Sequence, residues 1–229
     1  MGKKKSKGSG KKQERLERES LRRRTLERLQ GPNGLEDCGA SALAPALLEY
    51  DGCGVSFAAS GALGADATDE IFALLSGNMR AQYEASDWGW DAKEKRGELG
   101  DGGARFAVAR DAATGALAAF VHFRFEPDDD DEPKRAALYV REIQVAASAR
   151  GKGLGKRLMS LLHIVAAGLD LDCVMLTVFK ANAGAKRFYL DKLKYAVDAD
   201  DPANFGDDAA CYTILSRPLP RRPALAPTN

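Results

Sequence analysis

The chain has 229 residues, of which 45% are hydrophobic and 29% charged, with a formal net charge of +1. This length and composition indicate one domain with a sizeable core rather than an unstructured chain. No stretch reaches the roughly 18 apolar residues of a membrane-spanning helix, and no apolar signal segment follows the basic N-terminus. We therefore expect a soluble, intracellular protein.

The small net charge conceals an asymmetry along the chain. Residues 1–30 contain 12 Lys or Arg and 4 Asp or Glu, a net charge of +8, whereas the remaining residues contain 22 basic and 29 acidic side chains, a net charge of −7. An acidic body favours a cationic substrate over direct nucleic-acid binding. An ordinary solvated surface with a basic tail would give the same numbers.

Four cysteines, at positions 38, 53, 173 and 211, are widely spaced, and the chain has two histidines. None of the cysteines forms a C-x-x-C pair. We expect no metal site and no disulfide framework.

The N-terminal region divides into a tail and a helix. Residues 1–12 are small and basic and are expected to be disordered, whereas residues 13–30 lack Gly and Pro and contain many helix formers. Leu16, Leu26 and Leu29 give this helix a thin apolar stripe, so it is either solvated or packed on the body, and Gly31-Pro32 should end it. The expected organisation is a basic tail and helix over 1–30, a folded domain over 31–217 and a Pro-rich tail over 218–229.

Alternating and helical hydrophobic patterns follow one another in the domain. A strand is expected over 55–59, then a helix with Thr68 as its N-cap that continues to Glu84. Strands over 105–110, 117–125 and 136–145 should follow, with the acidic loop 128–132 before the third. A helix from Leu154, a strand over 173–179, a helix over 182–193 and two pairing strands over 195–198 and 211–216 complete a mixed α/β domain.

The most informative segment is Arg150-Gly151-Lys152-Gly153-Leu154-Gly155, between a predicted strand and a predicted helix. Glycines allow a ligand to approach the backbone, and the free N–H groups and positive dipole end of a helix start suit a pyrophosphate. Arg150, Lys152 and Lys156 add positive charge. The segment lacks the G-K-[ST] ending of a P-loop and the spacing of a dinucleotide fold.

Two motifs resemble the GCN5-related N-acetyltransferase (GNAT) superfamily. Arg150-x-x-Gly153-x-Gly155 is similar to its pyrophosphate loop, and Asn182-x-x-Ala185-x-x-Phe188-Tyr189, followed by Leu193-x-Tyr195, is similar to its second signature. The resemblance implies an α/β GNAT fold, with a central mixed, mostly antiparallel sheet flanked by helices, and acetyl-CoA as cosubstrate.

Five further segments narrow the resemblance to the NatD class, over roughly residues 50–217. They are Trp88-Gly89-Trp90, His122-Phe123-Arg124-Phe125, the loop from Arg150 to Lys156, residues 174–180 and Ile214-Leu215-Ser216-Arg217. That class acetylates the N-terminal α-amine of histones H-four and H-two-A, whose tails begin Ser-Gly-Arg-Gly. The resemblance implies these histone tails as partners and a location in nucleus and cytoplasm.

The resemblance also implies which residues contact each substrate. Acetyl-CoA would be bound by Ile143, Gln144, Val145, Arg150, Gly151, Lys152, Gly153, Leu154, Gly155, Lys156, Asn182 and Tyr189. The acceptor would be bound by Tyr83, Trp88, Glu126, Tyr139, Arg141 and Tyr212. Two of these positions depart from the NatD pattern, since Arg141 stands where a second tyrosine is expected and Glu126 where an aspartate is expected.

Glu142 and Tyr139 are the candidate catalytic residues. The nucleophile must be a neutral amine, and an α-amine has a pKa of roughly 7.7–8.0 against about 10.4 for a lysine, so help from one carboxylate suffices. The alternative for Glu142 is a surface strand carboxylate. Tyr189 is a candidate proton donor to the departing thiolate, whereas we expect His122 to be a hydrogen-bonded strand histidine.

Three alternatives remain open. The same fold also serves acetylation of lysines or small amines, and the basic tail could belong to a non-enzymatic nucleic-acid adaptor. Met1-Gly2-x-x-x-Ser6 fits an N-myristoylation acceptor, so a membrane is a partner only if Gly2 is modified. The sequence does not predict an oligomeric state.

Overall fold

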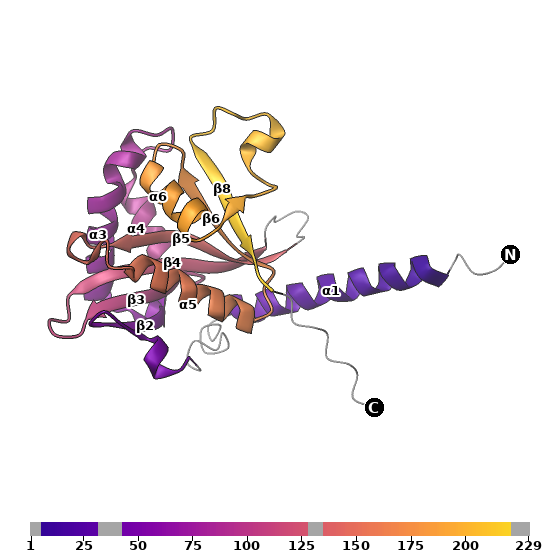
Figure 1. Ribbon diagram of the computed structural model, residues 1–229, viewed down its shortest axis with the longest axis horizontal. Helices are drawn as coiled ribbons and strands as arrows, with labels where there is room; N and C mark the ends of the chain where they lie inside the picture. The colour runs from indigo at the N-terminus through magenta and orange to yellow at the C-terminus, as the bar shows by residue number, and fades with distance from the viewer. Residues whose placement is uncertain (1–5, 32–42, 128–134, 221–229) are drawn as a thin grey trace.

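The computed structural model describes residues 6–31, 43–127 and 135–220, which form a single eight-stranded sheet covered by helices (Figure 1). The strand order is β1-β2-β3-β4-β5-β6-β8-β7, and every neighbouring pair is antiparallel except β5 and β6. The strands are β1 (Glu49–Tyr50), β2 (Cys53–Ala59), β3 (Arg105–Asp111), β4 (Leu117–Pro127), β5 (Ala136–Val145), β6 (Cys173–Phe179), β7 (Ala196–Val197) and β8 (Tyr212–Pro218). The predicted mixed, mostly antiparallel α/β fold is confirmed.

The helices lie on both faces of this sheet. They are α1 (Ser6–Gln30), α3 (Ala65–Glu84), α4 (Ala92–Gly100), α5 (Leu154–Gly168) and the short α6 (Ala183–Arg187), which continues into one π-helical turn, η5 (Phe188–Lys192). Period-2 alternation assigns strand side chains to the two faces. Ala107 and Ala109 of β3 join the core formed with α5 and the end of α1, whereas Phe106 and Val108 join the core formed with α3 and α4.

A β-bulge in β5 changes which side chains face α3. His122 of β4 is opposite Glu142, but the next β4 residue, Phe123, is opposite Val140, so Arg141 is the extra residue. Strict alternation would place Glu142 on the same face as Val140, in the α5 core. Because one inserted residue reverses the alternation, Glu142 instead faces α3.

Strands β5 and β6 diverge just where this bulge lies. Their parallel pairing runs from Ala137 opposite Cys173 to Val140 opposite Leu176, whereas β4 accompanies β5 as far as Val145. Parallel neighbours joined by a helical crossover can separate at one end without losing the rest of the sheet. The separation leaves the last residues of β5 paired on one side within the described chain, and opens a space between the two strands.

Helix α1 is longer than expected and only its end packs on the body. Residues 6–12 were expected to be disordered, but the helix begins at Ser6, as a chain without proline permits, and extends away from the sheet (Figure 1). Leu26 and Leu29 are buried in the core. The buried Arg105 of β3 donates to the carbonyl of Gly31 at 2.8 Å, and Arg22 pairs with Asp172 at 2.8 Å, so the packed alternative for this helix is confirmed for its C-terminal end.

Four other element predictions need correction. Thr68 does not cap α3, since the helix begins at Ala65 after Gly64, and the Thr68 hydroxyl donates to the Gly64 carbonyl at 2.8 Å. Helix α4 was not predicted, because its side chains are almost all polar. The helix expected over 182–193 is a five-residue α-helix followed by the π-turn, and β8 extends to Pro218. The acidic loop 128–132 lies outside the described residues.

Candidate active site

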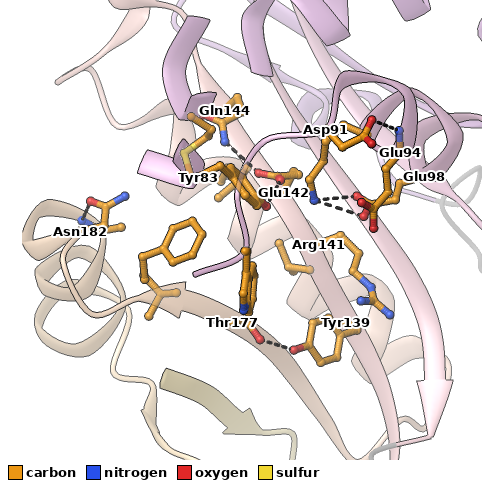
Figure 2. A pocket seen from close by; sticks show the side chains of 18 of the residues that line it. Tyr83, Asp91, Glu94, Glu98, Tyr139, Arg141, Glu142, Gln144, Thr177 and Asn182 are labelled. Carbon is orange, nitrogen blue, oxygen red and sulfur yellow. Dashed lines mark hydrogen bonds and ion pairs between the residues drawn. The ribbon is translucent and has the colours of Figure 1, made fainter. Parts of the chain in front are cut away.

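A cavity of about 410 Å³ occupies the space where β5 and β6 separate, bounded by α3, α4 and the start of α6 (Figure 2). Nine of the nineteen predicted site residues line it, namely Tyr83, Trp88, Tyr139, Arg141, Glu142, Ile143, Gln144, Asn182 and Tyr189. Glu126 and Tyr212 lie beside it through contacts to Arg141 and Trp88. The structure therefore brings the predicted catalytic and acceptor residues to one place.

Glu142 lies in the centre of the cavity and is not a surface carboxylate, since its exposed fraction is 6%. The Tyr83 hydroxyl donates to one carboxylate oxygen at 3.1 Å, and the Gln144 amide donates to the other at 3.0 Å (Figure 2). Burial raises the pKa of Glu142 above its ordinary value, against the nearby Lys95 charge and these hydrogen bonds, which lower it. A higher pKa makes this carboxylate a stronger proton acceptor than an exposed glutamate.

Tyr139 is held away from solvent by its neighbours. Its hydroxyl shares a hydrogen bond with the Thr177 hydroxyl, and the Arg141 guanidinium lies 4.8 Å from the centre of its ring. Burial raises the pKa of Tyr139. Arg141 in turn donates to Glu126 at 2.7 Å. The two departures from the NatD pattern, Arg141 and Glu126, are thus paired with each other.

Aromatic rings form one wall of the entrance. The Trp88 side chain, which is 49% exposed, has its ring centre 5.0 Å from that of Tyr212 and 5.1 Å from that of Phe179. Tyr83 stacks edge-on against Phe179 at 5.0 Å. Phe179 was not predicted, because on β6 it continues an apolar run typical of a buried strand.

Helix α4 supplies charged groups that the sequence did not single out. Lys95 pairs with Glu98 at 2.9 Å and lies 4.5 Å from the centre of the Tyr83 ring. Asp91 caps this helix by accepting from the backbone N–H of Lys93 and Glu94. The cavity lining contains four carboxylates (Asp91, Glu94, Glu98 and Glu142) and two cations (Lys95 and Arg141), so its charge favours a cationic ligand.

The predicted coenzyme loop forms the N-terminus of α5. Gly153 is the N-cap with a φ of +88°, and the first N–H with a backbone acceptor in the described chain at this end is that of Arg157, which donates to Gly153 at 3.0 Å. The preceding N–H groups are available to an anion, as at any helix start. Together with Lys152 and Lys156, and with the one-sided edge of β5, this geometry fits a coenzyme carrying a diphosphate and an extended amide arm.

Two details of the loop differ from the expected arrangement. A side chain at Gly153 would meet the Tyr50 hydroxyl, which itself donates to the Lys152 carbonyl at 3.1 Å. Arg150 does not extend freely into solvent, since its guanidinium donates to the Val145 carbonyl at 3.1 Å and to the Asn78 side chain at 2.6 Å. Arg150 therefore joins the loop to the end of β5 and to α3.

Asn182 and Tyr189 lie on the other side of the cavity. The Asn182 side chain caps α6 by accepting from the Ala185 N–H at 3.0 Å (Figure 2). Tyr189 is buried in the π-turn, and burial raises its pKa. A buried tyrosine that keeps its proton at neutral pH can donate a hydrogen bond to the sulfur of a departing thiolate.

His122 is not the hydrogen-bonded strand histidine that we expected. Within the described residues neither of its ring nitrogens has a hydrogen-bond partner, and its ring stacks on Phe106 with centres 5.1 Å apart. Burial lowers the pKa of His122 to about 3. It is a neutral core side chain, and it does not line the cavity.

Among the residues that the structure describes, no group of three metal-ligating side chains is close enough to bind an ion, and no helix is long and apolar enough to span a bilayer. Cys53, Cys173 and Cys211 form no disulfide with one another, and Cys38 lies outside the described residues.

A bulged strand that separates from its parallel neighbour, next to a helix N-terminus suited to a diphosphate, fits an acyltransferase that uses a coenzyme thioester. The family model for the acetyltransferase (GNAT) family matches residues 66–195, more than half of the chain. The chain belongs to the GNAT family of acetyltransferases, whose acetyl donor is acetyl-CoA.

A curated protein is similar to part of this sequence. The N-terminal acetyltransferase complex ARD1 subunit homolog of Dictyostelium discoideum is 31% identical over 88 residues, which are 38% of this chain and 42% of that protein. The match thus spans less than half of the relative.

Solved structures agree over a longer range. Arabidopsis thaliana NAA60 in complex with a bisubstrate analogue has a TM-score of 0.53 at 11% identity, covering 73% of this chain and 99% of that one. Ard1 from Thermoplasma volcanium has a TM-score of 0.52 at 13% identity, covering 74% and 99%. A GNAT acetyltransferase from Listeria monocytogenes has a TM-score of 0.51 at 17% identity, covering 72% and 94%. At these identities the likeness concerns the fold.

Proposed function

We propose that this acetyltransferase transfers acetyl from acetyl-CoA to the N-terminal α-amine of other proteins, as the NatD class does. The observation that carries this proposal is Glu142, a buried carboxylate with a raised pKa in a cavity whose entrance is aromatic and acidic. The curated relative named as a subunit homolog of an N-terminal acetyltransferase complex supports the same acceptor group.

The residues divide the reaction between them. Glu142 accepts a proton from the α-ammonium group, directly or through one water, and leaves a neutral amine. That amine attacks the thioester carbonyl supplied by acetyl-CoA, a carbon–nitrogen bond forms, the carbon–sulfur bond breaks, and the nitrogen releases a second proton to solvent. The departing thiolate accepts a hydrogen bond from Tyr189 and takes its proton from solvent. Tyr83 holds the Glu142 carboxylate in place through its 3.1 Å hydrogen bond.

Acceptor choice follows from the charges at the entrance. An unblocked N-terminus enters past Trp88 and Tyr212, whose rings pack against each other as one wall of the entrance and favour small first residues such as Ser-Gly. A guanidinium at the third position then meets the carboxylates of α4, Glu94 and Glu98. The tails of histones H-four and H-two-A begin Ser-Gly-Arg-Gly and satisfy both requirements, and an enzyme that acts on them would reside in nucleus and cytoplasm.

A peptide series tests this function. The parent peptide starts Ser-Gly-Arg-Gly, and two matched peptides carry either alanine in place of the arginine or a blocked α-amine. With the full chain and acetyl-CoA, we expect acetylation of the parent, about tenfold lower kcat/KM for the alanine peptide and none for the blocked peptide, by mass spectrometry. Equal acetylation of the blocked peptide, on a lysine, would show a lysine acetyltransferase instead.

A further inference from the structure

Four side chains connect the coenzyme loop to the proposed base. Arg150 donates to the Asn78 side-chain oxygen at 2.6 Å, the Asn78 amide donates to the Gln144 oxygen at 3.0 Å, and the Gln144 amide donates to Glu142 at 3.0 Å. Asn78 comes from α3, Gln144 and Glu142 from β5, and Arg150 from the loop before α5. The line therefore joins three separate segments of the chain.

The direction of every bond in this line is fixed by its two ends. A guanidinium has only donors and an ionised carboxylate only acceptors. Arg150 must therefore face the Asn78 oxygen, and Glu142 must face the Gln144 NH₂ group. The remaining Asn78 NH₂ group and Gln144 oxygen then face each other with matching polarity, so neither amide can be reversed without losing a bond.

The burial of this line of hydrogen bonds strengthens its effect on Glu142. Glu142 and Gln144 are each 6% exposed. In a poorly solvated site, hydrogen bonds in series polarise one another, and each amide here turns its donor end toward Glu142. Arg150 and Asn78 also donate to the Val145 carbonyl, at 3.1 and 3.3 Å, which anchors the line to the end of β5.

Other polar groups face Glu142 from the surrounding elements. They are Tyr83 from α3, Lys95 and Glu98 from α4, Tyr189 from η5, and His122 opposite it on β4. Lys95 favours the ionised carboxylate and Glu98 opposes it. None of these contacts reaches the coenzyme loop, so the link to Arg150 is supplied by Asn78 and Gln144.

We propose that Asn78 and Gln144 are positioning residues that transmit the charge of Arg150 to Glu142, and so tie the ionised state of the base to the coenzyme loop. The proposal rests on the proposed role of Glu142 as the base. It assigns a function to Asn78, which belongs to neither of the two family motifs. It also gives Arg150 a second function besides its proximity to a diphosphate.

The test compares the pH dependence of kcat for the full-length parent and Asn78→Ala. Loss of the line removes hydrogen-bond donors that favour the ionised carboxylate, so the ascending limb of the kcat–pH profile should move to higher pH by about one unit. At a pH below that limb, kcat should fall by roughly tenfold. Activity should return at alkaline pH. The dissociation constant for CoA, by calorimetry, should change less than about threefold, because Asn78 does not form the helix N-terminus.

Further variants separate this role from a general loss of structure. Asn78→Asp has the same size and still accepts from Arg150, but cannot donate to Gln144, so it should shift the limb at least as far. Gln82→Ala, one turn further along α3, removes an amide that bonds only to Met79 among its described partners, and should leave the limb in place. Arg150→Met should weaken CoA binding and shift the limb, whereas Lys152→Met should weaken CoA binding alone.

A double variant distinguishes the possible failures. If Glu142→Gln is impaired, then adding Asn78→Ala to it should cause no further loss, because the group being positioned is gone. An unshifted limb in both Asn78 variants, with Glu142→Gln still impaired, overturns the relay and leaves the proposed function intact. A Glu142→Gln enzyme with parental kcat overturns the base assignment and the relay with it.

Discussion

The coenzyme half and the acceptor half of this site are built from different parts of the polypeptide. The coenzyme half consists mainly of backbone, namely the one-sided edge of β5 and the N–H groups that begin α5, with the charges of Lys152 and Lys156 beside them. The acceptor half consists of side chains from α3, α4, β5, β6 and β8 that meet around Glu142. One half depends on where glycines allow the chain to turn, and the other depends on how distant elements pack.

This difference between a backbone site and a side-chain site explains which substitutions each half tolerates. A backbone site depends on one or two conformations, such as the positive φ of Gly153. A side-chain site can change its members, and here Arg141 and Glu126 replace the tyrosine and aspartate of the NatD pattern while forming a 2.7 Å pair with each other. Substitutions should therefore separate into those that affect the coenzyme and those that affect the acceptor.

The largest effect is expected for Glu142→Gln in the acceptor half. Removing the proton acceptor should lower kcat by about 10²–10⁴-fold at neutral pH, because general-base help has that magnitude. Raising the pH should partly restore the rate by deprotonating the α-amine in solution. Calorimetry should show CoA binding within about threefold of the parent, and parental turnover at neutral pH would contradict the assignment.

The next effect is expected for Gly153→Val in the coenzyme half. Its Cβ would meet the Tyr50 hydroxyl, and a β-branched residue at a φ of +88° is strained by about 1–2 kcal/mol. CoA affinity should fall at least tenfold. Gly151→Val is the control, since Gly151 also has a positive φ but no neighbouring atom within 4 Å of the place where a Cβ would lie, and it should bind CoA more tightly than Gly153→Val. Equal affinities would show that backbone strain alone is responsible.

A smaller effect on acceptor choice is expected for Glu98→Gln. The change removes one carboxylate and frees Lys95 from its 2.9 Å pair, so the entrance becomes less attractive to a cation. The kcat/KM for the Ser-Gly-Arg-Gly peptide should fall about fivefold at low salt, with little change for its alanine counterpart. Glu84→Gln, an exposed carboxylate of α3 outside the cavity, is the matched control. A similar loss on both peptides would contradict recognition of the arginine.

The smallest effect on activity is expected for His122→Phe, which tests whether this histidine belongs to the core alone. Turnover should stay within about twofold of the parent. In the parent the pKa of His122 is about 3, so below pH 6.5 the unfolded chain takes up a proton that the folded chain does not, and the free energy of unfolding falls as pH decreases.

The same variant should therefore reduce the pH dependence of stability. His163, whose pKa burial lowers to about 4, contributes in the same direction and remains. Urea unfolding between pH 6 and 5 should show a slope smaller than that of the parent by up to about 1.4 kcal/mol per pH unit. An unchanged slope, or loss of turnover, would contradict the core assignment.

The sequence predicted the fold well and located the glycine-rich turn before α5, for a physical reason. A glycine-rich turn between a strand and a helix is local, so Arg150 to Lys156 could be recognised from neighbouring residues. The strands over 105–111, 117–127, 136–145 and 173–179 were expected within two residues, because their apolar runs are clear. Glu142 was identified from a motif and from the chemistry that an amine needs.

The acceptor half was less predictable because its geometry arises from packing. Nothing local marks the bulge at Arg141, yet it moves Glu142 from the face of Val140 to the face of α3. Helix α4 has almost no apolar stripe, so Lys95 and Glu98 resembled a solvated segment. Asn78 lies on a helix that was predicted, but its partner Arg150 is 72 positions away.

The most direct test of N-terminal acetylation is a competition between two amines within one peptide. A peptide that starts Ser-Gly-Arg-Gly and contains a later lysine offers the full chain an α-amine and a side-chain amine at the same concentration. After partial reaction with acetyl-CoA, fragmentation mass spectrometry locates the acetyl group. We expect acetyl on the N-terminal serine nitrogen, with Glu142→Gln reducing that product, whereas acetyl on the lysine would contradict N-terminal acetylation.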